Sequence, residues 1–354
     1  MTTKHNYYLD LAFQLAEKNI GRTSLNPSVG TVIVKNGAVI SSGVTSINGR
    51  PHSEFNALKN IKNCPGASLY TTLEPCVHHG KTPPCVNIIV KKKIKKVYYA
   101  FEDPDKRTFK KAKKFFKTKG IKSKLVPSKN YKKFYRSYFI NKKLSVPLIS
   151  GKIAVSKDYF TINNKYKWIT NSTSRKIAHL LRNKFDAIIS TSKSINYDNS
   201  LLNCRIDGLN KDKPDLFIID LKLKLKKKLS LNNLLKCRKT FLVTSKDNIK
   251  KTIAYKKLGY KIIYIKQLKD KNDFNFFYKK IYKMGYSRIL VEAGLTFLNN
   301  LIRNKAIHDL YIFKSNNKLS KYGKNNDTIK YLKKIPTKLL KINLNGDNLF
   351  KKEF

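Results

Sequence analysis

A set of potential metal ligands in the first quarter of the chain constrains its fold more than any other sequence feature. His52 and Glu54 form an H-x-E triplet just before an expected helix. Cys76 and Cys85 follow in the stretch EPCVHHGKTPPC, where Cys76 ends an expected strand. One imidazole and two thiolates suit a catalytic zinc ion that keeps its fourth position for water. The start of a helix and the end of a strand must therefore meet in space around one ion.

This ligand set also indicates a type of chemistry. Zinc lowers the pKa of a bound water toward about 7, which makes hydroxide available at neutral pH. Glu54 lies two residues from His52 and can receive the water's proton and hand it to a departing amine, as in zinc nucleobase deaminases. His78 and His79 compete as ligands, but three protein ligands and one water already complete a tetrahedron. We therefore predict a zinc-dependent deaminase site in which these two histidines lie around the metal or contact the substrate.

Strand and helix patterns alternate along the first part of the chain, which indicates a layered α/β domain. Asn36 and Gly37 between two β-prone runs predict a hairpin. Strands are expected at 29–34, 38–44, 67–72 and 97–100, and helices at 7–20, 54–61, 86–90 and 108–117.

A boundary between two domains is expected near residue 147. Residues 131–145 are polar and aromatic without clean periodicity, and Pro147 precedes a new β-prone run at 148–154. We therefore predict a first domain at 1–146 and a second α/β domain at 147–354. In the second domain, strands are expected at 187–191, 216–220, 240–244, 261–265, 288–291 and 310–313, and helices at 274–284 and 296–303.

The net charge is strongly positive, because 75 Lys and Arg residues outweigh 22 Asp and Glu residues to give +53. Such a field favours anionic partners. Lysine is spread over expected loops and helices alike, so we expect no specific nucleic acid, and the charge alone does not choose between an anionic lipid and a phosphorylated small molecule. No apolar run is long enough to span a membrane, and five cysteines without a cleavable leader pattern indicate a cytoplasmic protein. A homo-oligomer is compatible with these features.

Motifs along nearly the whole chain resemble those of one enzyme family. They are NPSVG at 26–30, PHSE at 51–54, TLEPCVHHGKTPPC at 72–85, DP at 103–104, WIT at 168–170, LLR at 180–182, DAI at 186–188 and VEAG at 291–294. On these residues the chain is similar to the bifunctional deaminase-reductases of riboflavin biosynthesis. Eight residues separate Cys76 from Cys85, whereas the cysteines of cytidine-type and tRNA-type deaminases usually lie two residues apart.

The resemblance implies a fold and two successive reactions. A cytidine-deaminase-like three-layer domain would remove the 2-amino group of 2,5-diamino-6-ribosylamino-4(3H)-pyrimidinone 5′-phosphate with the help of Zn²⁺. A dihydrofolate-reductase-like domain would then reduce the ribosyl group to a ribityl chain with NADPH. No G-x-G-x-x-G follows an expected strand, which disfavours a Rossmann dehydrogenase.

The resemblance also implies roles for individual residues. An amide such as that of Asn26 can both donate to and accept from the polar edge of a pyrimidine. The guanidinium group of an arginine suits a phosphate. The backbone amides of a helix that starts after Gly294 suit a cofactor phosphate. The implied zinc ligands are His52, Cys76 and Cys85, with Glu54 as the proton carrier. The implied substrate-binding residues are Asn26, Lys81 and Asp103 in the first domain and Arg182, Leu202, Arg205 and Glu292 in the second. The implied cofactor-binding residues are Ala154, Trp168, Ser194, Asp198 and Gly294.

Several positions depart from the family pattern. The family commonly has a histidine at the position of Thr45 and glycines at the positions of Lys110 and Ala112. In the second domain, the departures are Lys157 and Tyr159 within SKDY in place of SLDG, a shortened segment at Lys165 and Tyr166, Ser200 in place of proline, and Leu221 in place of serine.

Two other functions are consistent with parts of the sequence. A zinc deaminase acting on a nucleobase in RNA would use the positive charge for attraction. A basic nucleic-acid-binding protein would instead hold a structural zinc with a fourth protein ligand, which His78 or His79 would supply.

Overall fold

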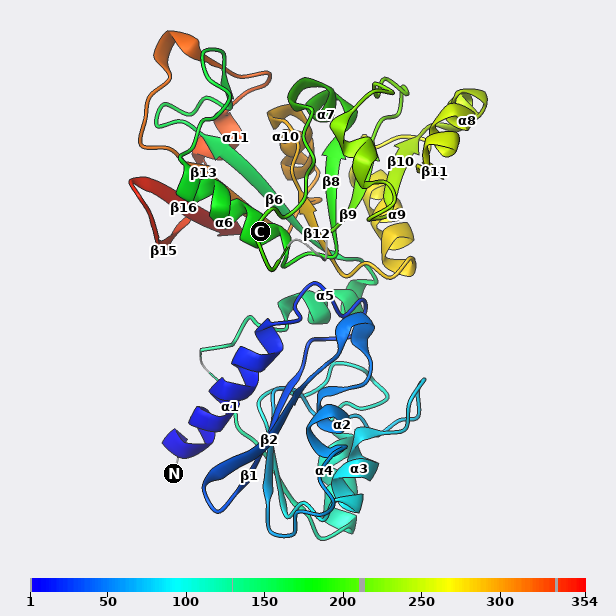
Figure 1. Cartoon of the computed structure of the whole chain (residues 1–354), viewed down its shortest axis with the longest axis vertical. Helices are drawn as coiled ribbons and strands as arrows, with labels where there is room; N and C mark the ends of the chain where they lie inside the picture. Colours follow the sequence, from blue (N-terminus) through cyan, green and yellow to red (C-terminus); the bar gives the residue numbers. More distant parts are fainter. Residues whose placement is uncertain (1, 129, 210–213, 335–336) are drawn as a thin grey trace. The chain divides into compact units, whose positions relative to one another are not determined.

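The structure is a computed structural model that describes residues 2–128, 130–209, 214–334 and 337–354. The chain divides into two units, Met1–Ser145 and Val146–Phe354, each built around its own main sheet (Figure 1).

The first unit has a five-stranded sheet with the strand order β2-β1-β3-β4-β5. Strand β1 runs antiparallel to β2 and to β3, whereas β3, β4 and β5 run parallel. The elements are α1 (Thr2–Glu17), β1 (Gly30–Lys35), β2 (Ala38–Val44), α2 (Ser53–Leu58), β3 (Ser68–Thr71), α3 (Cys85–Lys91), β4 (Lys96–Tyr99), α4 (Lys111–Thr118), β5 (Lys122–Leu125) and α5 (Arg136–Leu144).

Successive side chains along these strands point into two different helical layers. Val32 of β1 packs in one buried cluster with Phe13 of α1 and Tyr138 of α5. Ile33, the next residue of β1, packs in a second cluster with Leu58 of α2, and α3 and α4 contribute to the same cluster. The sheet therefore lies between helices on both faces, and the layered α/β architecture expected from the sequence is confirmed.

The position of α2 depends on a glycine in the neighbouring strand. A Cβ atom added at Gly43 of β2 would lie 2.4 Å from the backbone nitrogen of Ala57 and 2.4 Å from the carbonyl oxygen of Ser53. Only glycine allows the helix and the strand to approach this closely. This contact fixes the helix whose first turn carries Glu54.

The second unit has a nine-stranded sheet with the order β11-β10-β9-β8-β12-β6-β13-β16-β15. The seven neighbouring strands from β11 to β13 are parallel, and β16 and β15 extend the sheet with antiparallel pairing. The strands are β6 (Leu148–Val155), β8 (Ala187–Thr191), β9 (Asp215–Ile219), β10 (Thr240–Thr244), β11 (Lys261–Tyr264), β12 (Arg288–Val291), β13 (Asp309–Lys314), β15 (Lys338–Leu344) and β16 (Asp347–Glu353).

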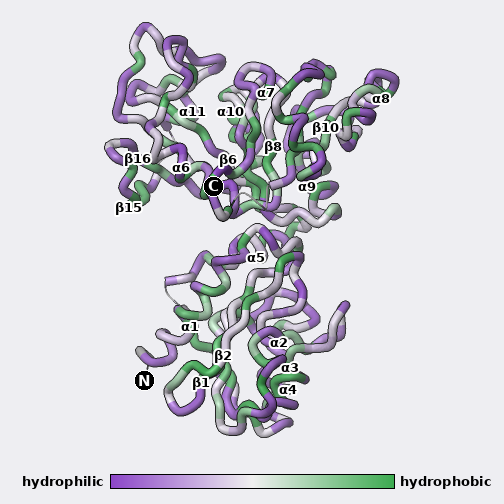
Figure 2. The backbone as a smooth tube through the Cα atoms, in the orientation of Figure 1, coloured by the Kyte–Doolittle hydropathy of each residue, from purple (hydrophilic) through white to green (hydrophobic). Residues whose placement is uncertain are grey.

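Helices and a small second sheet complete this unit. The helices are α6 (Ser172–Arg182), α7 (Ser192–Asp198), α8 (Ile249–Leu258), α9 (Lys271–Lys283), α10 (Leu295–Arg303) and α11 (Lys330–Lys334). Strands β7 (Ile162–Asn163) and β14 (Gly323–Lys324) pair antiparallel and join two long loops. Hydrophobic segments run through the main sheets of both units, and hydrophilic segments predominate in the loops (Figure 2). Within the described ranges, every helix is too short or too polar to span a membrane.

Candidate functional site

Three side chains from separate elements of the first unit converge on one point. His52 directly precedes α2, Cys76 lies in the loop after β3, and Cys85 is the first residue of α3. Their ligand atoms all lie within 4.8 Å of one another. The Nδ1 atom of His52 is 3.7 Å from the Sγ atom of Cys76 and 3.4 Å from the Sγ atom of Cys85. The structure therefore brings together the three residues predicted as zinc ligands.

These distances fit a single zinc ion. In a tetrahedral site, bond lengths of about 2.3 Å to sulfur and about 2.0 Å to nitrogen place these two atoms about 3.5 Å apart. Both measured sulfur–nitrogen distances lie close to this value. His78, one of the competing ligand candidates, is instead hydrogen-bonded through Nδ1 to the hydroxyl of Thr108 at 2.9 Å.

The two thiols have different affinities for a proton. The backbone N–H of Cys85 donates to the Sγ atom of Cys76 at 3.2 Å. The thiol of Cys85 and the side chain of His52 also hydrogen-bond to Cys76. Together these contacts lower the pKa of Cys76 to about 4, although its burial favours the protonated form. The contact with Cys76, together with burial, raises the pKa of Cys85. The site thus favours a thiolate, the form of cysteine that binds metal.

Glu54 is buried beside these ligands, in the first turn of α2. The hydroxyl of Ser53 donates to the Oε2 atom of Glu54 at 3.1 Å, and the same hydroxyl is 2.7 Å from that of Thr31 on β1. Burial, followed by the charge of Cys76, raises the pKa of Glu54. A carboxyl group that binds a proton more readily than usual is suited to proton transfer.

The predicted substrate residues of the first unit lie in three different loops. Asn26 donates through Nδ2 to the carbonyl of Gly49 at 2.8 Å, which ties the loop before β1 to the segment that leads to the zinc ligands. Asp103 is buried, and its Oδ1 atom accepts from the N–H of Asp105 at 2.9 Å. Burial is the main reason that the pKa of Asp103 is raised to about 6. Lys81 is exposed in the loop between the two cysteines.

Glu74 organises the loop around Asp103, a role that sequence reasoning missed. Its Oε2 atom accepts from the N–H groups of Asp103 at 3.2 Å and Lys110 at 3.1 Å, and its Oε1 atom accepts from the N–H of Ala112 at 3.0 Å. Glu74 belongs to the quoted TLEPC motif, so the motif itself was the available signal. The partners, 29 to 38 residues further along the chain, were not visible in it.

The same loop explains two departures from the family pattern. Lys110, at a position where the family usually has glycine, adopts the left-handed conformation with φ 58°. Ala112, at the second such position, is completely buried, so there is little room for a larger side chain. The backbone thus retains a conformation suited to glycine at Lys110, whereas Ala112 lies within α4 and is limited by the space around it.

In the second unit, most of the predicted residues meet at the carboxyl ends of neighbouring parallel strands. Strands β6, β8 and β12 are adjacent in the sheet. Ala154 lies at the end of β6, Ser194 lies in the helix after β8, and Gly294 directly precedes α10 after β12. The N–H of Gly294 donates to the hydroxyl of Ser194 at 3.0 Å. Such an edge is the usual ligand site of an open α/β sheet.

Arg182 and Glu292 form a mostly buried ion pair at this edge. The Nε and Nη2 atoms of Arg182 donate to the two carboxylate oxygens of Glu292 at 2.6 and 2.9 Å, and Nη1 donates to the carbonyl of Asn203 at 2.8 Å. Burial alone would raise the pKa of Glu292, but Arg182 outweighs it and lowers that pKa to about 2. Lys152 lies 3.9 Å from the same carboxylate. Most of the guanidinium of Arg182 is therefore engaged within the protein.

Arg205 lies on the exposed side of this pair. Its Nη2 atom is 3.2 Å from the Nε2 atom of His179, and its side chain is exposed. Leu202 is buried nearby in the chain, with its backbone in the left-handed region at φ 48°. Of the two arginines predicted for a phosphate, Arg205 is the one that faces solvent.

Trp168 and Asp198 lie outside the two hydrogen-bonded pairs, Ser194 with Gly294 and Arg182 with Glu292. Trp168 is half exposed in the loop between β7 and α6, with the guanidinium carbon of Arg175 4.9 Å from its ring centre. Burial raises the pKa of Asp198 at the end of α7, and the charge of Lys167 opposes this effect.

The departure at Tyr159 also has a structural consequence. Tyr159 replaces the glycine of the family's SLDG and adopts a left-handed conformation with φ 68°. The Nζ atom of Lys314 lies 4.0 Å from its ring centre, and that of Lys333 lies 5.5 Å away. These cation–π contacts offset part of the cost of the backbone conformation.

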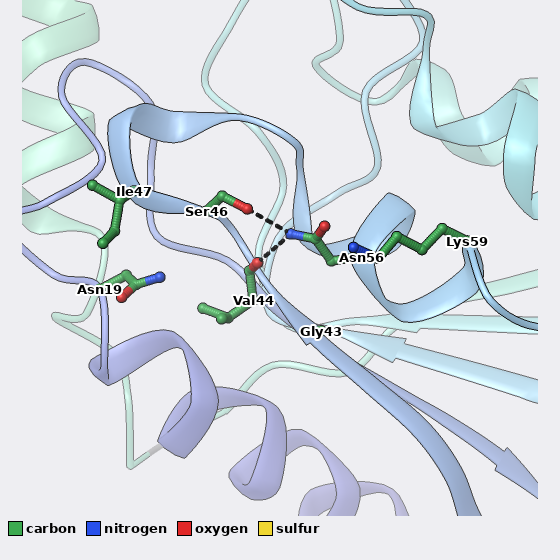
Figure 3. A pocket seen from close by; sticks show the side chains of 7 residues that line it. All are labelled: Asn19, Gly43, Val44, Ser46, Ile47, Asn56 and Lys59. Atoms are coloured by element: carbon green, nitrogen blue, oxygen red, sulfur yellow. Dashed lines mark hydrogen bonds between the residues drawn. The ribbon is translucent and has the colours of Figure 1, made fainter.

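A surface pocket lies beside α2, and none of the zinc ligands lines it (Figure 3). Inside it, the side-chain amide of Asn56 donates to the carbonyl of Val44 at 2.8 Å and to the hydroxyl of Ser46 at 2.9 Å. The lining residues are Asn19, Gly43, Val44, Ser46, Ile47, Asn56 and Lys59. None of the residues predicted for the site is among them.

Comparison with known proteins gives matches over both units. The family model of the cytidine and deoxycytidylate deaminase zinc-binding region matches residues 2–101, and that of the RibD C-terminal domain matches residues 150–314. The riboflavin biosynthesis protein RibD of Buchnera aphidicola is 33% identical, over 91% of this chain and 89% of its own length. The protein of the same name from Aquifex aeolicus is 30% identical, over 86% of this chain and 85% of its own length.

Solved structures match the whole chain. RibD of Acinetobacter baumannii superimposes with a TM-score of 0.84 at 25% identity, covering 99% of this chain and 98% of that one. A diaminohydroxyphosphoribosylaminopyrimidine deaminase/5-amino-6-(5-phosphoribosylamino)uracil reductase of Thermotoga maritima gives the same TM-score at 23% identity, covering 99% of each chain. The second match shows a shared fold across both units.

Proposed function

The chain belongs to the RibD family of riboflavin biosynthesis proteins, and from this premise we propose which of its residues carry out each reaction. It is a bifunctional enzyme with deaminase and reductase activities, and its cofactors are Zn²⁺ and NADPH. Its first part has the cytidine-deaminase-like fold, and its second part has the dihydrofolate-reductase-like fold. We assign the deaminase to residues 1–146 and the reductase to residues 147–354.

The deaminase substrate in this proposal is 2,5-diamino-6-ribosylamino-4(3H)-pyrimidinone 5′-phosphate. His52, Cys76 and Cys85 would hold the zinc ion, which would make a bound water molecule acidic enough to react at neutral pH. Glu54 accepts a proton from that water and passes it to the 2-amino group as this leaves. The water oxygen becomes the new carbonyl oxygen, and the amino group departs as ammonia. The convergence of the three ligand atoms beside a buried Glu54 is the observation that carries this proposal.

The remaining residues of the first unit bind the substrate in this proposal. Asn26 contacts the polar edge of the pyrimidine, since an amide offers both a donor and an acceptor. Lys81 and Asp103 contact the phosphate and the sugar. The exposure of Lys81 supports a phosphate contact, and the burial of Asp103 supports a contact with a neutral hydroxyl.

In the second unit, a bound NADPH would supply the hydride for the reduction of the ribosyl group to a ribityl chain. Ala154, Trp168, Ser194, Asp198 and Gly294 bind the cofactor in this proposal. The contact between Ser194 and the start of α10 supports it, because the free amides of a helix start attract phosphate. Leu202, Arg205 and Glu292 bind the substrate, with Arg205 toward the phosphate, and Arg182 holds the carboxylate of Glu292 in place.

A two-step assay tests the proposal. The purified protein should release ammonia from the phosphorylated diaminopyrimidine and should then oxidise NADPH. Glu54→Gln should retain zinc and lose ammonia release, while NADPH oxidation with the deaminated intermediate continues. Ammonia release from an RNA hairpin, with none from the small substrate, would contradict it. The relationship to RibD proteins favours the small substrate over RNA.

We also propose a cytoplasmic location for the protein. All five cysteines are free, and the zinc ligands among them must remain reduced to bind metal. A reducing compartment meets this need. Fractionation of cells that express the chain would test it, and recovery of the protein outside the cytoplasm would contradict it.

A further inference from the structure

Helix α5, at the end of the first unit, makes hydrogen bonds to segments that carry the deaminase site. Tyr135 directly precedes the helix, and Tyr138 and Lys142 lie three and seven residues further on. This spacing places the three side chains on one face of the helix. Tyr135 and Tyr138 are buried.

The hydroxyl of Tyr135 joins two of these segments. It donates to the carbonyl of Ser28 at 3.1 Å, and it is 2.5 Å from the hydroxyl of Thr72. Thr72 in turn accepts from the N–H of Gly30 at 3.1 Å. The contacts tie together the segment after Asn26 and the end of β3, from which the chain leads to Cys76.

Tyr138 and Lys142 hold the third segment. The hydroxyl of Tyr138 donates to the Oδ1 atom of Asp103 at 3.0 Å. Lys142 donates to the Oδ2 atom of Asp105 at 2.8 Å, and its Nζ atom lies 5.4 Å from the ring centre of Tyr138. Arg107 also pairs with Asp105 through two hydrogen bonds of 2.9 and 2.7 Å.

The two oxygens of the Asp103 carboxyl group differ in their hydrogen bonding. The hydroxyl of Tyr138 and the N–H of Asp105 both donate to Oδ1. Within the ranges that the structure describes, the Oδ2 atom of Asp103 receives no hydrogen bond from the protein. Oδ1 is thus fixed from two sides, which sets the direction of Oδ2.

We propose that Tyr138 is a positioning residue of the deaminase, and that it orients the Asp103 carboxyl group toward the substrate, with Lys142 steadying the loop through Asp105. The inference rests on the proposed contact of Asp103 with the substrate. It assigns a role in substrate binding to α5, a helix that lies outside the zinc-binding motifs and ends just before the second unit begins.

The test compares single variants of the full-length protein in the ammonia-release assay. Tyr138→Phe removes only the hydroxyl and should raise the KM for the phosphorylated diaminopyrimidine roughly ten-fold, as expected for the loss of a hydrogen bond to a charged group. It should change kcat much less, because the zinc ligands and Glu54 are untouched. Lys142→Met should raise KM by a smaller factor. NADPH oxidation with the deaminated intermediate should be unchanged in both variants.

Two matched controls come from the same part of the chain. Tyr131→Phe also removes one hydroxyl, from a ring that stacks on Phe13 with centroids 4.0 Å apart. Lys143→Met removes one charge from an exposed position of α5. Both should behave as the unmodified protein. If Tyr138→Phe lowers kcat and leaves KM at the control value, its role is structural only and the inference is wrong.

Asp103→Asn separates this inference from the proposed function. If Asp103→Asn leaves KM unchanged, the proposed substrate contact of Asp103 fails, and the inference fails with it. If Asp103→Asn raises KM while Tyr138→Phe matches its control, only the positioning inference is overturned. In the double variant, Tyr138→Phe should add little to the effect of Asp103→Asn, because it acts through that carboxyl group. If the KM increases of the two single variants multiply in the double variant, Tyr138 does not act through Asp103.

Discussion

Removing the guanidinium of Arg182 should destabilise the second unit strongly. The pKa of Glu292 is about 2 instead of the usual 4.5, and this difference corresponds to about 3 kcal/mol of stability at neutral pH. Arg182→Met would leave the mostly buried Glu292 without its two-fold hydrogen-bonded partner, with only Lys152 at 3.9 Å. Loss of one partner of a buried pair costs about 3–5 kcal/mol. This is a large part of the roughly 5–15 kcal/mol that stabilises a typical domain.

The chain offers a direct readout of this change. Trp168 is its single tryptophan and lies in the second unit, so tryptophan fluorescence during urea unfolding follows that unit. Lys176→Met is the matched control, because it removes a charge from the same helix at an exposed position. Adding Glu292→Leu to Arg182→Met should recover part of the loss, since the unpaired charge is gone.

The alternative reading of Arg182 gives a different result. If its guanidinium served only to bind the substrate phosphate, Arg182→Met would raise the reductase KM and leave unfolding unchanged. An unfolding free energy within about 1 kcal/mol of the Lys176→Met control would therefore refute the buried-pair reasoning.

Three further predictions concern stability. Because the pKa of Glu292 is lowered, its contribution should be present above about pH 4.5 and lost as the pH falls toward 2, which acid titration of the fluorescence would show; a constant stability over that range would contradict it. Glu74→Ala should destabilise the first unit by about 2–5 kcal/mol, because buried N–H groups lose their acceptor. It should also speed hydrogen exchange at residues 103–112, and unchanged exchange would count against it. Lys110→Gly should stabilise this unit by about 1 kcal/mol in calorimetry, because glycine relieves the left-handed backbone. Lys113→Gly, within α4, should destabilise the unit by a similar amount. If both variants change the stability in the same direction, the prediction is wrong.

The sequence predicted the buried part of the fold best. The expected strands at 187–191, 240–244 and 288–291 coincide with β8, β10 and β12. Interior parallel strands are buried on both faces and read as continuous apolar runs. The expected hairpin was also confirmed, with β2 at the expected residues and β1 displaced by one residue.

Two edge strands and several helices were not predicted, among them α5, α6, α7 and α8. Strand β5 reads KSKL, and β15 reads KLLKINL. Both lie at the edge of a sheet, where lysine is tolerated, so their pairing depends on the neighbouring strand more than on their own composition. Residues 131–145 have no clean helical period, yet they form α5, because Tyr135 and Tyr138 are held by partners elsewhere in the unit.

The site also contains residues that the local sequence predicts and residues whose contacts depend on distant parts of the chain. Residue types and local spacing were enough to predict the zinc ligands and the proton carrier, which are His52, Cys76, Cys85 and Glu54. The pair of Arg182 with Glu292 could not, because it spans 110 residues and depends on the order of the strands. Contacts that support a site are set by the fold, and short motifs do not reveal them.

The most direct test of the central claim is the zinc X-ray absorption spectrum of the purified protein, recorded with its metal content. One zinc per chain should be bound by two sulfur atoms, one imidazole nitrogen and one exchangeable oxygen, and Cys85→Ser should lose a sulfur ligand or the metal. A spectrum without sulfur, or one with four protein ligands that leaves no place for water, would contradict the hydrolytic role of the site.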